Sequence, residues 1–221
     1  MAVKETEVLL VTDTSNSMSD CMAAINEALR QIFSCVQKAS ILTYANRAKW
    51  QNPAGSAWKD LKAGGNTDFA RACEELNKKM SPTGDIFAEN PVIVLFSDGE
   101  SSYGYKAALE KLTKNPAFKN AVKLVFAAGI RNTRAGFLPD FAGSSGKVHV
   151  FDPDAINDCV NIILKACGLP PVAVPKKPPP PTKQAKPVTP PPTEPEPEIV
   201  IIQPDEETEK EPDDFFVDDE W

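Results

Sequence analysis

Residues 92–99 read VIVLFSDG, and residues 8–17 read VLLVTDTSNS. Each stretch is a run of apolar, mostly branched residues that leads to an aspartate, Asp98 in the first and Asp13 in the second. Continuous apolar runs of this length are typical of strands that are buried on both faces, as in a parallel sheet. The two stretches therefore predict two buried strands, each followed by polar residues at its carboxyl end.

The rest of the first 169 residues alternates between strand and helix patterns. We expect further strands at 39–44, 49–50, 122–127 and 147–151, and helices at 22–33, 68–80, 105–113, 137–141 and 154–167. Ser19 or Asp20 is the expected cap of the first helix. This alternation predicts an α/β, doubly wound domain at 1–169, with a mostly parallel six-stranded sheet in the order 3-2-1-4-5-6 and helices on both faces.

The composition changes after residue 169. Residues 170–221 contain 15 of the 21 prolines and carry a net charge of −8, whereas residues 1–169 are almost neutral. We expect a proline-rich, extended linker at 170–198 and a mostly disordered acidic tail at 199–221. Phe215, Phe216 and Trp221 stand among acidic residues in this tail. Short acidic segments with aromatic residues can bind apolar, basic pockets, so these three predict a partner-binding site.

Charge and cysteine content exclude several classes of protein. A nearly neutral body lacks the basic surface of a nucleic-acid-binding domain, and no run approaches the ~20 apolar residues of a membrane helix. The opening residues MAVKETEVLLVTD indicate a first strand and not a signal peptide. The five cysteines have no CxxC spacing and predict reduced thiols: Cys21, Cys35, Cys73, Cys159 and Cys167. We therefore expect a cytoplasmic protein that binds neither nucleic acid nor membrane.

Polar residues gather in three segments: DTSNS at 13–17, GGNT at 64–67 and SDG at 97–99. Ligands of open parallel sheets bind beyond the carboxyl ends of the strands, where the first and third segments should lie. The candidate ligands are all oxygen donors, namely Asp13, Ser15, Ser17, Thr67 and Asp98. Hard oxygen donors without His or Cys favour Mg²⁺, with Mn²⁺ or Ca²⁺ as alternatives, and argue against zinc.

Helix capping and catalysis account less well for these residues. Ser, Thr and Asp often cap helices, but capping does not explain three such loops at one sheet edge. A phosphatase of the haloacid dehalogenase type needs an acid two residues after Asp13, where this chain has Ser15. Serine hydrolysis needs a base, and the single histidine, His149, lies between valines in a predicted strand. With no GxGxxG or P-loop motif either, the sequence predicts no enzyme.

Together, DTSNS, GGNT and FSDG resemble the von Willebrand factor A (vWA) family and its metal-ion-dependent adhesion site, over residues 5–168. The resemblance implies that Ser15, Ser17 and Thr67 bind the metal directly and that Asp13 and Asp98 bind it directly or through water. It also implies that an Asp or Glu of a protein partner completes the coordination. The family's commoner DxSGS motif has glycine at Asn16, which is not a ligand position.

Three further stretches are similar to bacterial TerY-like vWA proteins, which are associated with tellurium resistance: IVLFSDGES, AALEKL and NPAFKNAVKLVFAAGI. Those proteins are thought to act with a protein kinase and a phosphatase in signalling or stress response. The resemblance implies a metal-dependent protein–protein interaction module whose tail recruits a second component. The alternative is a scaffold or adaptor in which the tail is the main binding element.

Overall fold

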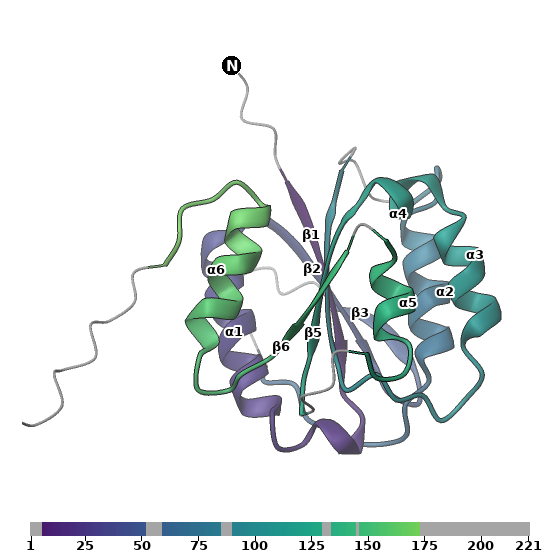
Figure 1. The fold of residues 1–221 in the computed structure, drawn as a ribbon, viewed down its shortest axis with the longest axis horizontal. Helices are drawn as coiled ribbons and strands as arrows, with labels where there is room; N and C mark the ends of the chain where they lie inside the picture. The colour runs from purple at the N-terminus through teal and green to yellow at the C-terminus, as the bar shows by residue number, and fades with distance from the viewer. Residues whose placement is uncertain (1–5, 52–58, 85–89, 130–133, 145, 173–221) are drawn as a thin grey trace, which may run out of the picture. The chain divides into compact units, whose positions relative to one another are not determined.

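A six-stranded sheet lies at the centre of the computed structural model, which describes residues 6–51, 59–84, 90–129, 134–144 and 146–172 (Figure 1). The strands run in the order β3-β2-β1-β4-β5-β6, and all neighbours are parallel except the antiparallel β2 and β3. Their bounds are β1 (Glu7–Asp13), β2 (Lys38–Tyr44), β3 (Ala48–Gln51), β4 (Val92–Ser97), β5 (Val122–Ala127) and β6 (Lys147–Val150). The predicted fold class and strand order are confirmed.

Helices cover both faces of the sheet (Figure 1). One face carries α1 (Met22–Cys35) and α6 (Ile156–Ala166). The other carries α2 (Phe69–Lys79), α3 (Lys106–Thr113), α4 (Pro116–Asn120) and α5 (Leu138–Ala142). A short 3₁₀ helix, η1 (Asn16–Met18), links β1 to α1.

Two apolar layers separate the helices from the sheet. In β1, Val8 and Leu10 face α1 and α6, whereas Leu9 and Val11 face α2 and α3, and none of the four is exposed to solvent. Each fully buried aliphatic side chain contributes about 1.5–3 kcal/mol to stability. The central strands are therefore packed on both sides, which makes their carboxyl ends rigid supports for the loops that follow.

The start of α1 differs from the expectation. Cys21 occupies the N-cap position, and no side chain there bonds to the helix. The Ser19 hydroxyl instead donates to the backbone oxygen of Asn16 at 2.6 Å, within the turn that η1 forms. The prediction that Ser19 or Asp20 caps this helix was wrong, because the chain makes a 3₁₀ turn before α1 begins.

Helix α4 was not predicted, although a local signal for it was present in the sequence. Asn115 caps α4 by accepting hydrogen bonds from the backbone of Ala117 at 2.9 Å and Phe118 at 3.4 Å, and Pro116 takes the first helical position. At the other end, the buried Lys123 ammonium donates to the carbonyl oxygens of Phe118 and Ala121 at 3.1 and 3.4 Å. Both ends of this short helix are thus tied down by side chains.

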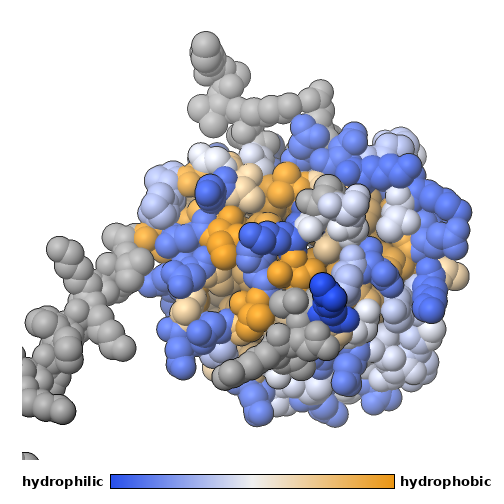
Figure 2. Space-filling view, viewed as in Figure 1, coloured by the Kyte–Doolittle hydropathy of each residue, from blue (hydrophilic) through white to orange (hydrophobic). Residues whose placement is uncertain are grey.

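The edge strand β6 carries part of the apolar surface of the domain. Figure 2 shows apolar surface around the edge strand β6, where Val150 is 46% exposed. In the part of the chain that is described, no helix combines the length and apolar character needed to cross a membrane.

Beyond α6, the Val172 N–H donates to Asn161 Oδ1 at 2.8 Å. The linker predicted at 170–198 lies outside the described residues from 173 on, as does the whole tail with Phe215, Phe216 and Trp221, so both stay predictions.

A pair of hydrogen bonds and an ion pair connect α1 to residues 60 and 61, which precede the loop at 64–67. Asn26 is buried; its Nδ2 donates to the backbone oxygen of Leu61 at 2.9 Å, and its Oδ1 accepts from the Leu61 N–H at 2.8 Å. Arg30 forms an exposed ion pair with Asp60 at 2.7 Å. The buried amide should stabilise this connection more than the ion pair does.

We expect Asn26→Ala to lower the free energy of unfolding by about 2–3 kcal/mol, because it leaves the Leu61 N–H and C=O buried without partners. The matched control is Arg30→Ala, which should lower the free energy of unfolding much less, since its ion pair is exposed to water. Urea unfolding followed by circular dichroism measures both values. Equal losses in the two variants would contradict this ranking.

Candidate metal centre

Three loops meet at the carboxyl edge of the sheet, the lower edge in Figure 1. The loop after β1 and the loop before α2 are joined by two backbone hydrogen bonds. The Asn16 N–H donates to the Gly65 oxygen at 3.1 Å, and the Gly64 N–H donates to the Thr14 oxygen at 2.7 Å. Asn16, where the commoner vWA motif has glycine, thus takes part in this connection through its backbone.

The loop after β4 is joined to both of the others. The Ser102 N–H donates to the Thr67 oxygen at 2.8 Å, and the Ser102 hydroxyl accepts from the Thr67 N–H at 3.3 Å. The Ser97 hydroxyl donates to Asp13 Oδ2 at 2.9 Å. Every pair of loops is therefore linked, and segments that lie up to 84 positions apart in the sequence form one polar site.

Two glycines permit these close approaches. Gly65 has φ of 85°, and a Cβ there would lie 2.8 Å from the Asn46 side-chain nitrogen. Gly99 has φ of 84°, and a Cβ there would lie 2.7 Å from the Ala135 carbonyl oxygen. Any other residue would be strained at both positions, so the two loops depend on glycine.

Asp13 lies at the centre of the site and is fully buried. Its Oδ1 accepts from the Ser15 N–H at 2.9 Å, and its Oδ2 accepts from Ser97. Burial raises the pKa of Asp13 to about 6; hydrogen bonds from Ser15 and Ser97 oppose the rise, and the charge of Asp98 adds to it. The site thus holds a carboxylate whose negative charge is poorly compensated by its protein neighbours.

The other four predicted ligands lie on the same three hydrogen-bonded loops. The Ser15 and Ser17 hydroxyls lie 3.1 Å apart, with Ser15 buried and Ser17 exposed. Thr67 and Asp98 are each 5% exposed. Asp98 Oδ1 accepts from the Glu100 N–H at 2.9 Å. Asp98 Oδ2 and the Thr67 hydroxyl bond to none of the described residues, so both oxygens retain their full capacity as ligands.

The donor chemistry suits a hard cation. Two carboxylates and three hydroxyls are the ligand types preferred by Mg²⁺, Mn²⁺ and Ca²⁺. Among the described residues, no group of three or more His, Cys, Asp or Glu side chains lies together as a metal site would, so any cation here would depend on the hydroxyl oxygens as well. The residues present therefore fit a hard divalent cation.

Three residues that shape this site were not predicted from the sequence. Ser97 and Ser102 connect loops, and Tyr44 ends β2 beside Asp13, its Cα partner in the sheet. A serine at the end of an otherwise apolar strand was the available signal for Ser97. Tyr44 gave no local signal, because its proximity to Asp13 depends on the register of β1 against β2.

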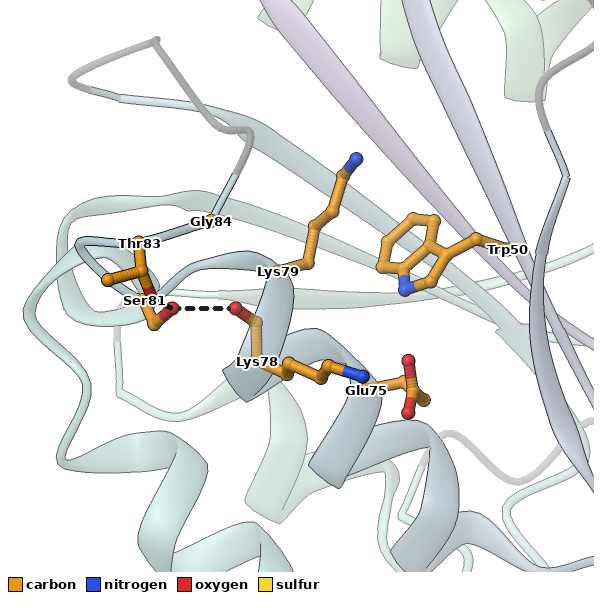
Figure 3. Close-up of a pocket in the computed structure, with 7 residues that line it drawn as sticks. All are labelled: Trp50, Glu75, Lys78, Lys79, Ser81, Thr83 and Gly84. Carbon is orange, nitrogen blue, oxygen red and sulfur yellow. Dashed lines mark hydrogen bonds between the residues drawn. The ribbon is translucent and has the colours of Figure 1, made fainter.

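A separate hollow of about 400 Å³ lies between β3 and α2 (Figure 3). Its wall includes Trp50 from β3 and Lys79 from α2, whose ammonium lies 5.3 Å from the centre of the Trp50 ring. None of the five predicted ligands lines this hollow. The single histidine is also placed elsewhere: His149 stacks on Phe126 with 5.4 Å between ring centres.

The strand order, the two-sided helical cover and the loops at this edge define the vWA fold. The chain has that fold. Comparison with protein-family models gives no match, and comparison with curated proteins gives none either.

Solved structures of the same fold include three from different organisms. An aerotolerance-related membrane protein from Bacteroides fragilis matches with 14% identity and a TM-score of 0.54, over 74% of this chain and 98% of that one. A von Willebrand factor type A protein from Catenulispora acidiphila matches with 17% identity and a TM-score of 0.53, and the match covers 74% of this chain but only 43% of that one. Manganese-loaded TRAP protein from Plasmodium vivax matches with 15% identity and a TM-score of 0.55, over 76% of this chain and 75% of that one. At such identities, the likeness shows the fold.

The raised pKa of Asp13 predicts how stability depends on pH in metal-free protein. The folded pKa of about 6 exceeds the ordinary value of 3.8, so the folded state holds the proton more tightly. The stabilisation from this group should be full below about pH 4 and should be lost as the pH rises through 6, a change of about 2–3 kcal/mol.

The measurement is urea unfolding in chelator at pH 4 and pH 7.5, for the natural chain and for Asp13→Asn. The neutral variant lacks this titration, so its stability relative to the natural chain should rise by that amount between the two pH values. A constant difference between the two proteins would mean that Asp13 has an ordinary pKa.

Proposed function

We propose that this chain is a protein-interaction module that binds its partner through a divalent cation, Mg²⁺ in the first place and Mn²⁺ or Ca²⁺ as alternatives. The observation that carries the proposal is the mutual hydrogen bonding of three loops, which gathers two carboxylates and three hydroxyls at one edge of a rigid sheet. Manganese in the TRAP protein, which shares the fold, supports a cation at such a site.

Each residue has a distinct part in this proposal. Ser15, Ser17 and Thr67 offer hydroxyl oxygens directly to the cation. Both oxygens of Asp13 already accept hydrogen bonds, from Ser15 and Ser97, which suits contact through water, whereas Asp98 keeps one oxygen without a partner among the described residues. A bound cation supplies a positive charge and an open coordination position, so an Asp or Glu of a partner protein can complete the shell.

We expect added Mg²⁺, Mn²⁺ or Ca²⁺ to raise the melting temperature of metal-stripped full-length protein. An ion at 100 times its dissociation constant adds about 2.7 kcal/mol, which corresponds to a shift of several degrees. Thr67→Val should abolish the shift, because it replaces a ligand hydroxyl with a methyl group of similar size. Differential scanning fluorimetry in chelator and in each ion measures the shift.

The matched control is Thr113→Val, which removes a hydroxyl that donates to the Glu110 carbonyl oxygen at the last residue of α3, outside the three loops. This variant should keep the full cation response. If no ion shifts the natural chain, the cation part of the proposal is wrong, and the tail becomes the main candidate for binding.

The tail gives the second element of the proposal. The acidic segment at 199–221, with Phe215, Phe216 and Trp221, would recruit a second component; in the alternative function, a scaffold or adaptor, it would be the main binding element. The specific support is composition, because 13 acidic residues and 15 prolines are concentrated in residues 170–221.

The cellular setting that we propose is the cytoplasm of a bacterium. The five free cysteines support a reducing compartment. The similarity to TerY-like proteins supports signalling or stress response, including tellurium resistance, beside a kinase and a phosphatase. Binding without catalysis is the proposed activity, and His149, the histidine that serine hydrolysis would use as a base, lies on β6, where it stacks on Phe126.

Affinity capture with three versions of the chain separates the two functions. Proteins held through the cation should be lost in chelator and in Asp98→Ala, but should remain when residues 199–221 are deleted. Proteins held through the tail should show the reverse. Mass spectrometry of each eluate identifies them, and a set that depends only on the tail would favour the scaffold function.

A further inference from the structure

Tyr44 lies next to Asp13, at the end of the strand that neighbours β1. It is the last residue of β2, and its Cα lies opposite that of Asp13 across the parallel pairing of β1 and β2. Its carbonyl oxygen accepts from the Thr14 N–H at 2.8 Å and from the Thr14 hydroxyl at 3.1 Å. Its ring packs against Phe69, 5.7 Å away between centres. The position of the whole side chain is therefore fixed by the backbone and by packing.

The hydroxyl of Tyr44 is fully buried and has no hydrogen-bonding partner among the described residues. A buried polar group without a partner is unfavourable, and phenylalanine would keep the packing without this cost. The hydroxyl lies where the charges of the site act on it. Burial raises the pKa of Tyr44 well above its usual value, and the charge of Asp13 raises it further. The Ser97 hydroxyl is near enough to lower the pKa, but its contact with the Tyr44 hydroxyl does not have the geometry of a hydrogen bond.

We propose that the Tyr44 hydroxyl is a positioning group of the cation site, which gains its hydrogen bond when the hydrated cation is bound. This inference rests on the proposed function, because it needs a cation between the three loops. The hydroxyl is not itself a ligand in this proposal. It donates a hydrogen bond to one of the oxygen atoms that surround the cation and so fixes the position of that oxygen, as groups outside the first ligand shell commonly do in metal sites.

The hydrogen bonds of Asp13 leave room for such support. Each carboxylate oxygen accepts one protein hydrogen bond, from Ser15 or from Ser97, and each has a further lone pair. Ser97 also accepts from the Gly99 N–H at 3.0 Å, so its hydroxyl is already engaged as donor and acceptor. The Ser97 hydroxyl has a single proton, which it already donates to Asp13, so it has none left to donate to the oxygen shell.

Two buried hydroxyls near this end of the sheet have no partner among the described residues, those of Tyr44 and Thr12. Thr12 precedes Asp13 by one position in β1, and successive side chains of a strand point to opposite faces of the sheet. Tyr44 is instead the direct neighbour of Asp13 in the pairing of β1 with β2, so the two side chains share a face. Tyr44 is therefore the better placed of the two to act on the cation site.

The test is Tyr44→Phe in the full-length chain, with Mg²⁺ affinity measured by isothermal titration calorimetry. We expect the dissociation constant for Mg²⁺ to rise about tenfold, which corresponds to about 1.4 kcal/mol. In chelator, the melting temperature should stay the same or increase, because the lost hydroxyl had no partner. The control is Tyr105→Phe, whose ring also packs on Phe69 and which should keep the natural affinity.

Carbon-13 labelling of the tyrosine ring at Cζ gives an independent readout. The chain has three tyrosines, so the Tyr44 signal is the one missing in Tyr44→Phe. We expect Mg²⁺ to shift that signal.

The outcomes distinguish this inference from the proposed function. Natural affinity in Tyr44→Phe overturns the inference and leaves the proposed function intact. A lower melting temperature in chelator with an unchanged response to Mg²⁺ shows a purely structural role and also overturns it. If the natural chain binds none of the three cations, the proposed function fails and the inference fails with it.

Discussion

The buried carboxylate of Asp13 is the constraint on which the site depends. It lies at the end of β1, between β2 and β4, in surroundings that disfavour its charge. Its hydrogen bond with Ser97 joins the ends of the two central strands, and its bond with the Ser15 N–H sets the direction of the loop toward α1. Because a buried charge is unfavourable without polar partners, the hydrogen bonds that the loops donate to Asp13 are essential to the site.

The sheet makes this arrangement rigid. β1 and β4 are buried along almost their whole length, and apolar layers press on both of their faces. The loops at their ends are therefore anchored to elements that cannot shift independently, and they are also bonded to one another. A site built on such supports can hold its oxygen atoms in place before any ligand arrives, which lowers the entropic cost of binding.

Most of the sheet and the loops of the site could be predicted from the sequence, because they depend on local patterns of apolar and polar residues. The apolar runs that end at Asp13 and Asp98 predicted the two central strands, and the alternation of strand and helix patterns predicted the order of the sheet. The segments DTSNS, GGNT and SDG predicted the five candidate ligands. Ser97 and Tyr44 were not predicted as part of the site, since their relation to Asp13 arises from the register between strands. The cap of α1 was wrong because η1 intervenes, whereas the Asn115-Pro116 signal for α4 was present and overlooked.

The buried amine of Lys123 offers a way to measure how often α4 moves away from the rest of the domain. Its amine is buried under α4, satisfied by two carbonyl oxygens and placed 4.9 Å from the centre of the Phe118 ring. Burial lowers its pKa, so the amine loses its proton more readily than an exposed lysine. Movement of the end of α4 would break the hydrogen bonds to Phe118 and Ala121 and expose the amine to an acylating reagent. The rate at which Lys123 is modified would therefore report the frequency of that local opening, while exposed lysines report only the concentration of reagent.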